Sequence, residues 1–333
     1  MPDIIIIGDI NVDVNFMIPA YPLPGNEAIA TTVQMNTGGS AVNTAIALAK
    51  MDMNVGLIGR IGRDTLAKQV LADLNAIGID CTHIQTDPKV STGLIFIAVS
   101  VDGERTMFAA RGANAFTEAT LLDPEYFLHC RWLHLSGYSF LSYHQHETLL
   151  HALDLAKNSP HTRISLDIGT EPAFRARSQI MEVLPKIDVI FPNEVELRYL
   201  SEGRSINDGL DYLMDQGAKT IATKRSRKGS ILALGNKRIT FPAFEVNSKD
   251  TTGAGDSFNA GVVLGHLVGL SWEAATALGN AFGGLATTQD GGGATAIRRN
   301  DISRLIETHL FKDEWAETQF ALEELIAYFE GVL

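Results

Sequence analysis

Short runs of consecutive apolar residues recur along the chain, separated by longer segments with the composition of helices. Strands that are buried on both faces of a parallel sheet show such continuous runs, because neither side of the strand meets water. Core strands are predicted at residues 4–7, 55–58, 132–135, 164–167, 189–191, 220–224 and from 230. Helices are predicted at about 64–77, 144–157 and 272–288, and after the glycine-rich stretch at 253–255. This alternation predicts an α/β fold with a mostly parallel central sheet.

One region of the first third of the chain has a different pattern. Residues 92–101 and 106–110 alternate around Asp102-Gly103, and Asp-Gly between two alternating runs is a strong signal for a β-hairpin. An antiparallel hairpin has no place in a parallel core, and a two-stranded ribbon needs further strands or a partner to be stable. Residues near 13–36 are predicted to supply the remaining strands of a small second sheet.

The composition fits an ordinary globular protein. The 333 residues suffice for one large α/β domain, and no internal repeat divides them, so a single domain over 1–333 is predicted. No apolar run approaches the length needed to span a bilayer. Residues 1–4 lack the basic segment of a signal peptide. Two isolated cysteines, Cys81 and Cys130, fit a reducing compartment, so a cytoplasmic location without a membrane partner is expected.

The charge balance narrows the class of partner. The formal net charge is −12, which argues against binding to the phosphate backbone of DNA or RNA. It does not argue against a nucleotide that is held by backbone amides and a metal ion. Neither a Walker phosphate-binding loop nor the His-Arg-Asp set of protein kinases is present in the sequence. Any phosphate site must therefore be built in another way.

The stretch Asp250-Thr251-Thr252-Gly253-Ala254-Gly255-Asp256 precedes an apolar helical pattern. Gly253 and Gly255 allow the backbone to turn tightly. The first amides of the helix have no partner within it, so they point outward and form an anion site at the positive end of the helix dipole. Asp256 stands beside that site, where a carboxylate can accept the proton of an attacking hydroxyl. The pattern indicates phosphoryl transfer, although an aspartate in a first helical turn is also common as a cap.

The whole run, followed by Ala260-Gly261, closely resembles the C-terminal signature of the ribokinase-like (phosphofructokinase-B) family of carbohydrate kinases. Residues 8–13 and 37–43 are similar to the N-terminal signature of that family, and the resemblance extends to about residue 296. It implies a three-layer sandwich in which about 13–36 and 91–111 form a small β-sheet lid over the sugar site. In the family this lid often makes a homodimer contact. Residues 313–333, predicted as an extra amphipathic helix, lie beyond the usual core.

Five N-terminal residues are candidates for binding the phosphate acceptor. Asn11 and Asp13 alternate along the chain and therefore share one face of a strand. Hydroxyl-rich ligands need such polar groups, although both residues are also common in turns. Gly38 and Gly39 precede a helix of small residues and let a ligand approach the backbone. Asn43 lies in the first turns of that helix and can reach toward the same ligand.

Asn193 and Glu196 stand one helical turn apart after a core strand, at the edge where open α/β sheets bind ligands. Oxygen ligands there suit Mg²⁺ that is held mostly through water and substrate phosphates. Acidic residues in a first turn also ordinarily complement the helix dipole. The spacing matches the Asn-x-x-Glu motif of the family, which implies that Glu196 handles Mg²⁺ through water beside bound ATP.

The resemblance also implies nucleotide contacts in the loop after the strand that ends at Lys224. In the family this turn usually reads Gly-x-x-Gly and borders the phosphates. Ser226 stands where the first glycine is expected, and Gly229 is the second. The basic residues between 225 and 228 either pair with a triphosphate or form a solvated turn.

Further contacts are implied near the C-terminal end of the resemblance. Asn280 and the glycine turn at 291–293 correspond to positions that border the adenine in the family. The same turn, with Asp250 and the Thr252 carbonyl, often holds a monovalent cation, so K⁺ is a further expectation there.

These observations predict an ATP-dependent sugar kinase in which Asp256 is the base and the amides of 253–256 form the anion hole. A neutral hexose or pentose derivative is the expected acceptor. Ribose itself is disfavoured, because Ser40 stands where ribokinase has a lysine, and residues 167–174 lack the arginine that ketodeoxygluconate kinases and fructokinases often place after this strand. Arg111, near the lid, suits an acid or phosphate on the acceptor or pairs with a neighbouring carboxylate. A nucleoside kinase of the same family and a sugar-binding sensor without turnover are the alternatives. The intact Asp256 disfavours the sensor.

Overall fold

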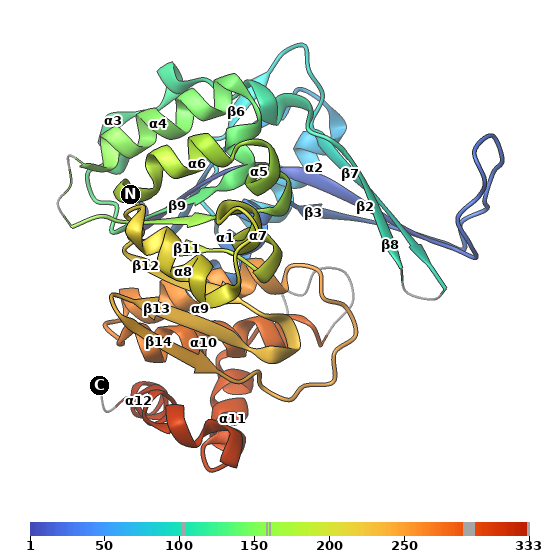
Figure 1. Cartoon of the computed structure of the whole chain (residues 1–333). Coiled ribbons are helices and arrows are strands. Elements are labelled where there is room, and N and C mark those ends of the chain that lie inside the picture. Colours follow the sequence, from blue (N-terminus) through green and yellow to red (C-terminus); the bar gives the residue numbers. More distant parts are fainter. Residues whose placement is uncertain (102–103, 158, 160, 289–296, 332–333) are drawn as a thin grey trace.

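The computed structural model describes residues 1–101, 104–157, 159, 161–288 and 297–331 (Figure 1). The Asp102-Gly103 turn and the glycine turn at 291–293, which were predicted from sequence, lie outside the described residues. Within these ranges, no helix combines the length and the apolar character needed to cross a membrane.

The central sheet has the strand order β14-β13-β12-β11-β10-β9-β1-β4. Its strands are β1 Ile4–Ile7, β4 Val55–Ile58, β9 Trp132–Ser136, β10 Arg163–Asp167, β11 Val189–Phe191, β12 Thr220–Lys224, β13 Ser230–Leu234 and β14 Lys237–Phe241. Neighbours pair in parallel from β12 to β4, and β13 and β14 add antiparallel strands at one edge. The predicted core strands and the mostly parallel sheet are therefore confirmed.

Helices cover both faces of this sheet, which gives three layers. One face is covered by α1 Ser40–Ala49, α2 Thr65–Ile77, α9 Ala254–Leu267, α10 Trp272–Ala286, α11 Arg299–His309 and α12 Gln319–Phe329. The other is covered by α3 Pro124–Phe127, α4 Tyr143–Lys157, α5 Thr170–Arg175, α6 Arg177–Val183, α7 Glu194–Leu200 and α8 Ile206–Asp215. In β1, Ile4 and Ile6 enter the first core, and Ile5 and Ile7 enter the second, because successive side chains of a strand point to opposite faces.

A separate four-stranded sheet, here called the small sheet, projects from the main body (Figure 1). Its order is β3-β2-β7-β8, with β2 Asn11–Ile18, β3 Thr32–Gly38, β7 Gly93–Ser100 and β8 Arg105–Ala110. The predicted hairpin is confirmed as the antiparallel pair β7 and β8. The segment near 13–36 supplies the other two strands, as predicted.

Cross-strand pairing divides the side chains of the small sheet between two faces. Asp13 pairs with Asn36 and Ile95, and these residues lie on what we call the inner face, together with Asn11 and Arg105. The outer face is apolar. The side chains that lie next to one another across the strands of this outer face are those of Val14, Phe16, Val33, Met35, Phe96 and Phe108.

Short elements connect the two sheets to the helices. They are β5 Arg60–Gly62 and β6 Gln85–Asp87, which pair with each other, and the 3-10 helices η1 Gly112–Phe116, η2 Ala119–Leu121, η3 Gly137–Leu141, η4 Leu184–Lys186 and η5 Ser226–Lys228. Of these, η1 and η5 matter for the site, because each follows a strand that carries candidate residues.

The predicted C-terminal helix over 313–333 is wrong in its first part. Asp313–Thr318 forms a 3-10 helix, η7, and the α-helix α12 begins only at Gln319. The reason is packing: the Trp315 side chain is fully buried, with its ring 4.5 Å from that of Phe244. Glu324 of α12 accepts hydrogen bonds from the backbone N–H (2.7 Å) and hydroxyl (2.5 Å) of Ser271, the N-cap of α10.

Candidate active site

Helix α9 begins where the glycine-rich stretch predicts it. Gly253 is its N-cap and has a φ of 72°, a left-handed conformation that glycine adopts without strain. The Ala254 N–H donates to the Thr251 carbonyl at 3.3 Å. In the described part of the chain, the N–H groups of Gly253, Gly255 and Asp256 have no acceptor. Amides without an acceptor at a helix N-terminus are what an anion site requires, and the anion site itself stays a prediction.

Asp256 lies in the first turn of α9 and is held by helix α1. The Asn43 side-chain N–H donates to Asp256 Oδ2 at 2.8 Å, and the Thr44 hydroxyl donates to the Asp256 backbone carbonyl at 3.3 Å. Burial raises the pKa of Asp256 to about 7, the negative charge of Asp167 adds to this, and the Asn43 hydrogen bond opposes it. A carboxylate with such a pKa is suited to accept a proton near neutral pH.

Asp13 and the two glycines at 38 and 39 lie together at the base of the small sheet. A Cβ on Gly38 would lie 2.1 Å from Asp13 Oδ2, and one on Gly39 would lie 2.5 Å from the Asp9 carbonyl. Gly39 also has a φ of 105°. Asp13 Oδ1 is buried and has no hydrogen-bond partner among the residues that the structure describes, and burial raises the pKa of Asp13 to about 6. An unpartnered buried carboxylate oxygen is the kind of group that a ligand hydroxyl can satisfy.

Asn11 and Arg111 are tied to neighbours that sequence reasoning missed. Asn11 Oδ1 accepts a hydrogen bond of 2.8 Å from Asn114 Nδ2 in η1. Arg111 pairs with Asp9 through Nε (3.0 Å) and Nη2 (2.8 Å), and it also contacts Gln145. Of the two interpretations offered for Arg111, the structure shows the pairing with a neighbouring carboxylate. No sequence signal marks Asn114 or Gln145, since each is a lone amide in an ordinary segment.

Lys224 is the last residue of β12, and Asp167 is the last residue of β10. Their side chains form a buried ion pair. Lys224 Nζ lies 2.7 Å from Asp167 Oδ1 and 3.3 Å from Asn259 Oδ1. A Cβ on Gly255 would lie 3.6 Å from Lys224 Nζ, so the ammonium group is next to the anion site. Burial opposes the charge on Lys224, but Asp167 and Glu196 outweigh it and hold the pKa of Lys224 above its usual value. Asp167 was missed, although its place at a strand end was a usable signal.

Asn193 and Glu196 form a complete capping box at the start of α7. Glu196 Oε2 accepts from the Asn193 backbone N–H at 2.8 Å, and Glu196 Oε1 accepts from Asn193 Nδ2 at 2.7 Å and from the Thr170 hydroxyl at 3.1 Å. Burial raises the pKa of Glu196, and the charge of Lys224 opposes this. The structure thus gives both residues a capping role that the sequence analysis did not predict, and the magnesium role stays a prediction.

The loop between β12 and β13 has a serine at the position where glycine was expected. Ser226 has a φ of 53°, so the position where glycine was expected does require a left-handed backbone, and serine adopts it here. Gly229 has a φ of 80°, and a Cβ there would lie 1.9 Å from the Phe241 carbonyl. Arg225 and Lys228 pair with Glu194 at 2.9 and 3.7 Å. The basic cluster is therefore partly neutralised by the protein itself.

Asn280, predicted to border the adenine, lies in α10 and is largely buried. Its Nδ2 donates to the Pro242 carbonyl at 3.0 Å, which holds the segment after β14 against the helix. The 291–293 turn predicted beside it is outside the described residues.

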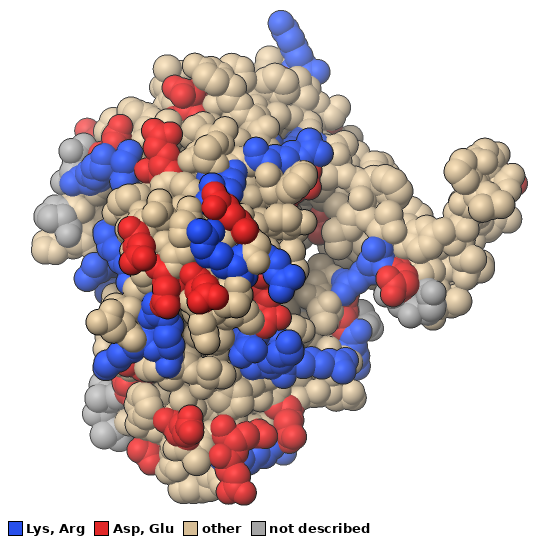
Figure 2. All heavy atoms as spheres, viewed as in Figure 1, with Lys and Arg blue, Asp and Glu red and all other residues tan. Residues whose placement is uncertain are grey.

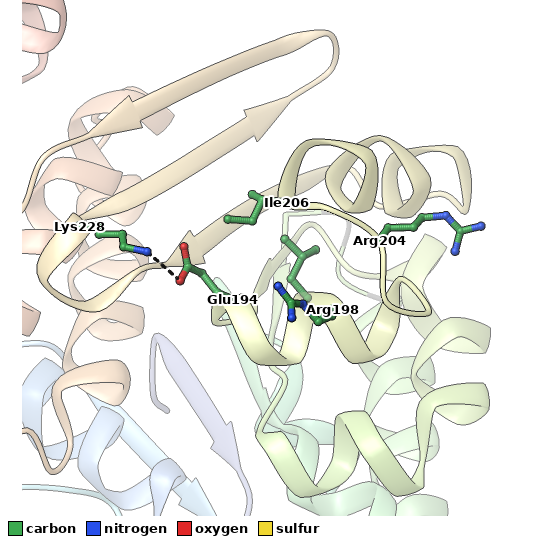
Figure 3. A pocket seen from close by; sticks show the side chains of 6 residues that line it. Glu194, Arg198, Arg204, Ile206 and Lys228 are labelled. Atoms are coloured by element: carbon green, nitrogen blue, oxygen red, sulfur yellow. Dashed lines mark ion pairs between the residues drawn. The ribbon is translucent and has the colours of Figure 1, made fainter.

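A small hollow of about 170 Å³ lies between α7, α8 and η5 (Figure 3). It is lined by Glu194, Leu197, Arg198, Arg204, Ile206 and Lys228. Figure 3 shows the Arg204 guanidinium turned away from the other labelled side chains. Ligand pockets usually measure about 300–1,000 Å³, so this hollow is too small for a nucleotide, and none of the predicted site residues lines it.

Arg105 makes a contact that the sequence did not indicate. It is the first residue of β8, and its Nη1 donates to Asp250 Oδ1 at 2.7 Å and also contacts the Thr252 hydroxyl. Its Nη2 donates to the Thr251 hydroxyl at 2.6 Å. Asp250 and the Thr252 carbonyl were predicted to hold a monovalent cation, and in the structure a guanidinium from the small sheet contacts the Asp250 carboxylate and the Thr252 hydroxyl.

Comparisons with known proteins bear on the family and the fold. The family model described as "pfkB family carbohydrate kinase" matches residues 1–298. A ribokinase from Haemophilus influenzae is 28% identical over 311 residues, which cover 91% of this chain and 97% of that protein. The solved ribokinase of Thermotoga maritima superimposes with a TM-score of 0.81 at 25% identity, covering 92% of this chain and 100% of that one.

A solved Escherichia coli protein in complex with ATP and Mg²⁺ has the same fold, with a TM-score of 0.80, 23% identity and coverage of 93% of this chain and 100% of that one. The eight-stranded core, the small sheet and the glycine-rich start of α9 lie in the region that the family model matches. The chain belongs to the pfkB family of carbohydrate kinases, which are phosphotransferases with an alcohol group as acceptor.

Proposed function

We propose that the protein transfers the γ-phosphoryl group of ATP to a hydroxyl of a small neutral sugar. The observation that carries this proposal is the place of Asp256: its carboxylate stands in the first turn of α9, beside three unpartnered amides. A proton acceptor next to an anion site is the arrangement that phosphoryl transfer to an alcohol needs.

In the proposed reaction the sugar hydroxyl oxygen attacks the γ-phosphorus in line. A new oxygen–phosphorus bond forms, the bond from the γ-phosphorus to the β,γ-bridging oxygen breaks, and ADP leaves. The hydroxyl proton passes to the Asp256 carboxylate, while the amides of Gly253, Gly255 and Asp256 stabilise the charge on the transferring group. Asn43 keeps the carboxylate oriented through its 2.8 Å hydrogen bond.

Several residues fit the binding of ATP and Mg²⁺. The negative charge of Asp167 raises the pKa of both Glu196 and Asp256, and the ammonium group of Lys224 lowers the pKa of all three carboxyl groups. This excess of negative charge suits a divalent cation, with Glu196 reaching it through water. Bound Mg²⁺ would neutralise the phosphates.

The nucleotide itself is proposed to lie along Lys224 and the loop after it. Ser226 and Gly229 would border the phosphates, and Asn193 would contribute from the start of α7. Asn280 would lie near the adenine. Support comes from the left-handed turn at Ser226 and from the position of Lys224 next to Gly255.

The acceptor is proposed to lie between the inner face of the small sheet and α9, so that the small sheet acts as a lid. Asn11, Asp13, Gly38, Gly39 and Asn43 would hold its hydroxyls. Arg111 is the cation that would have suited an acidic or phosphorylated acceptor, and it already pairs with Asp9. This pairing favours a neutral sugar.

We further propose that a second copy of the chain covers the outer face of the small sheet. Val33, Met35, Phe96 and Phe108 are 63, 54, 40 and 60% exposed there. Few charged side chains lie on the projecting part in the view of Figure 2. An exposed apolar patch of this kind marks an association site. Sedimentation should show a dimer, and Phe108→Glu should yield monomers; a native monomer would refute the proposal.

The first experiment is ADP formation from ATP–Mg²⁺ with a panel of pentoses, hexoses, sugar acids, sugar phosphates and nucleosides. A sharp rise with one neutral sugar supports the proposal. A rise with a nucleoside alone would make the protein a nucleoside kinase. Sugar binding in calorimetry without ADP formation from any acceptor would make it a sensor.

A further inference from the structure

Arg105 connects the small sheet to the segment that leads into the anion site. It is paired with Val99 and lies on the inner face, the same face as Asp13. Its guanidinium group contacts the Asp250 carboxylate and the hydroxyls of Thr251 and Thr252, which lie 145 to 147 positions later in the chain. The small sheet and the glycine-rich stretch therefore share an ion pair.

The segment that Arg105 contacts determines where the anion-site amides point. Asp250 Oδ1 also accepts the Thr252 backbone N–H at 2.9 Å and the Thr252 hydroxyl at 2.7 Å. The next residues are Gly253, in its left-handed conformation, and Ala254, whose N–H returns to the Thr251 carbonyl. A change at Asp250 therefore acts on the turn that sets the first amides of α9.

The Asp250 carboxylate also poses an electrostatic problem. It stands a few residues before the anion site, and an uncompensated negative charge near that site would repel the phosphates that the amides attract. The side chains of Arg105 and Asp250 are only 26 and 23% exposed, so water screens this charge incompletely. Arg105 places a positive charge 2.7 Å from Asp250 Oδ1.

We propose that Arg105 is a positioning residue that supplies the cation at Asp250 from the small sheet. It orders the turn at 250–252, and thereby the amides of 253–256, when the small sheet lies over the site. Phosphoryl transfer then needs no bound monovalent cation at Asp250, contrary to the expectation of K⁺ there. The inference rests on the proposed function for its catalytic consequence, and its binding consequence stands apart from it.

The test compares Arg105→Ala and Arg105→Lys with the native protein. Lys312→Ala serves as the matched control, because Lys312 is also a partly exposed cation in an ion pair, with Glu245 on another part of the surface. We expect Arg105→Ala to lower kcat roughly 10- to 100-fold through misplaced amides, with a partial recovery in Arg105→Lys and no change in Lys312→Ala.

Chemical rescue distinguishes positioning from a general loss of structure. The space left by Arg105→Ala is open to solvent, so guanidinium or K⁺ at millimolar concentration should restore part of kcat in that variant and leave the native protein unchanged. The same two cations should raise the melting temperature of Arg105→Ala more than that of the native protein or of Lys312→Ala. Tetramethylammonium, which is too large and lacks donors, should do neither.

Three results would overturn the inference: native kcat in Arg105→Ala, the same K⁺ activation in the native protein as in the variant, or no cation-dependent melting shift specific to Arg105→Ala. If the native protein forms no ADP with any acceptor, the proposed function fails instead. The melting shifts still decide whether Arg105 is the cation at Asp250, because they require no turnover.

Discussion

Asn43 and Asp256 are 213 positions apart in the chain, and a 2.8 Å hydrogen bond joins their side chains. The donor belongs to α1, which follows Gly38 and Gly39, the glycines predicted to bind the acceptor, and the carboxylate belongs to α9, whose N-terminus is the predicted anion site. Residues that were predicted separately, as acceptor binding and as base, thus form one unit. The hydrogen bond fixes the orientation of the carboxylate and favours its ionised form against the effect of burial.

Replacing Asp256 with asparagine keeps the shape of the side chain and removes the base. We expect kcat for sugar phosphorylation to fall roughly 10²–10⁴-fold, while the affinity for ATP changes little, because the amides are retained. Single-turnover kinetics and ATP titration measure the two effects separately. A near-native single-turnover rate would show that Asp256 is not the proton acceptor.

The pH dependence of kcat/KM should report the ionisation of Asp256. The base must be deprotonated, and burial raises the pKa of Asp256 to about 7, so activity should be retained above that pH and lost as the pH falls below it. Asn43→Ala removes a donor that favours the ionised form, so the acid limb should move to higher pH. Thr44→Val is the control, because Thr44 contacts the Asp256 backbone carbonyl and not the carboxylate. An unshifted limb in Asn43→Ala would contradict this account.

The buried pair of Lys224 and Asp167 should have a large effect on stability when only one partner is removed. Lys224→Met leaves a buried carboxylate without its cation, which should cost about 3–5 kcal/mol of unfolding free energy. The double variant Lys224→Met/Asp167→Leu should recover much of that loss. Urea denaturation measures both. Equal destabilisation of the single and double variants would mean that the unpaired charge is not the cause.

Ser226 holds a left-handed backbone conformation at the expense of stability. Ser226→Gly should raise the unfolding free energy by about 1 kcal/mol, since the left-handed conformation costs an ordinary residue roughly 1–2 kcal/mol. Ser226→Ala, which keeps the Cβ, should show no such gain. Thermal unfolding of the three proteins decides the matter, and a glycine variant less stable than the native protein would show that the serine hydroxyl compensates for the strain.

Much of the fold was readable from sequence because its signals are local. The apolar run at β1 and the glycines at the start of α9 each specify their own structure within a few residues. The candidate site could be predicted from the sequence where its residues lie within one motif, as at 250–256. Their roles in binding and catalysis remain predictions.

The remaining features depend on contacts between distant segments. In the sequence, Arg105 resembles any basic residue after a hairpin turn, and Asn114 resembles any other amide. Only the fold places Arg105 beside Asp250 and Asn114 beside Asn11. The start of α12 was misjudged because the pattern after Asp313 is amphipathic, and only the burial of Trp315 against Phe244 selects the tighter 3-10 helix.

The C-terminal packing has a practical consequence for anyone who shortens this protein. The family match stops at residue 298, yet Trp315 fills the core against Phe244, and Glu324 accepts hydrogen bonds from Ser271, the N-cap of the helix that carries Asn280. A chain trimmed at the family boundary would expose Phe244 and leave Ser271 without its acceptor. Aggregation and a loosened α10 are the expected results of such a cut, so the boundary of the family is not the boundary of the folding unit.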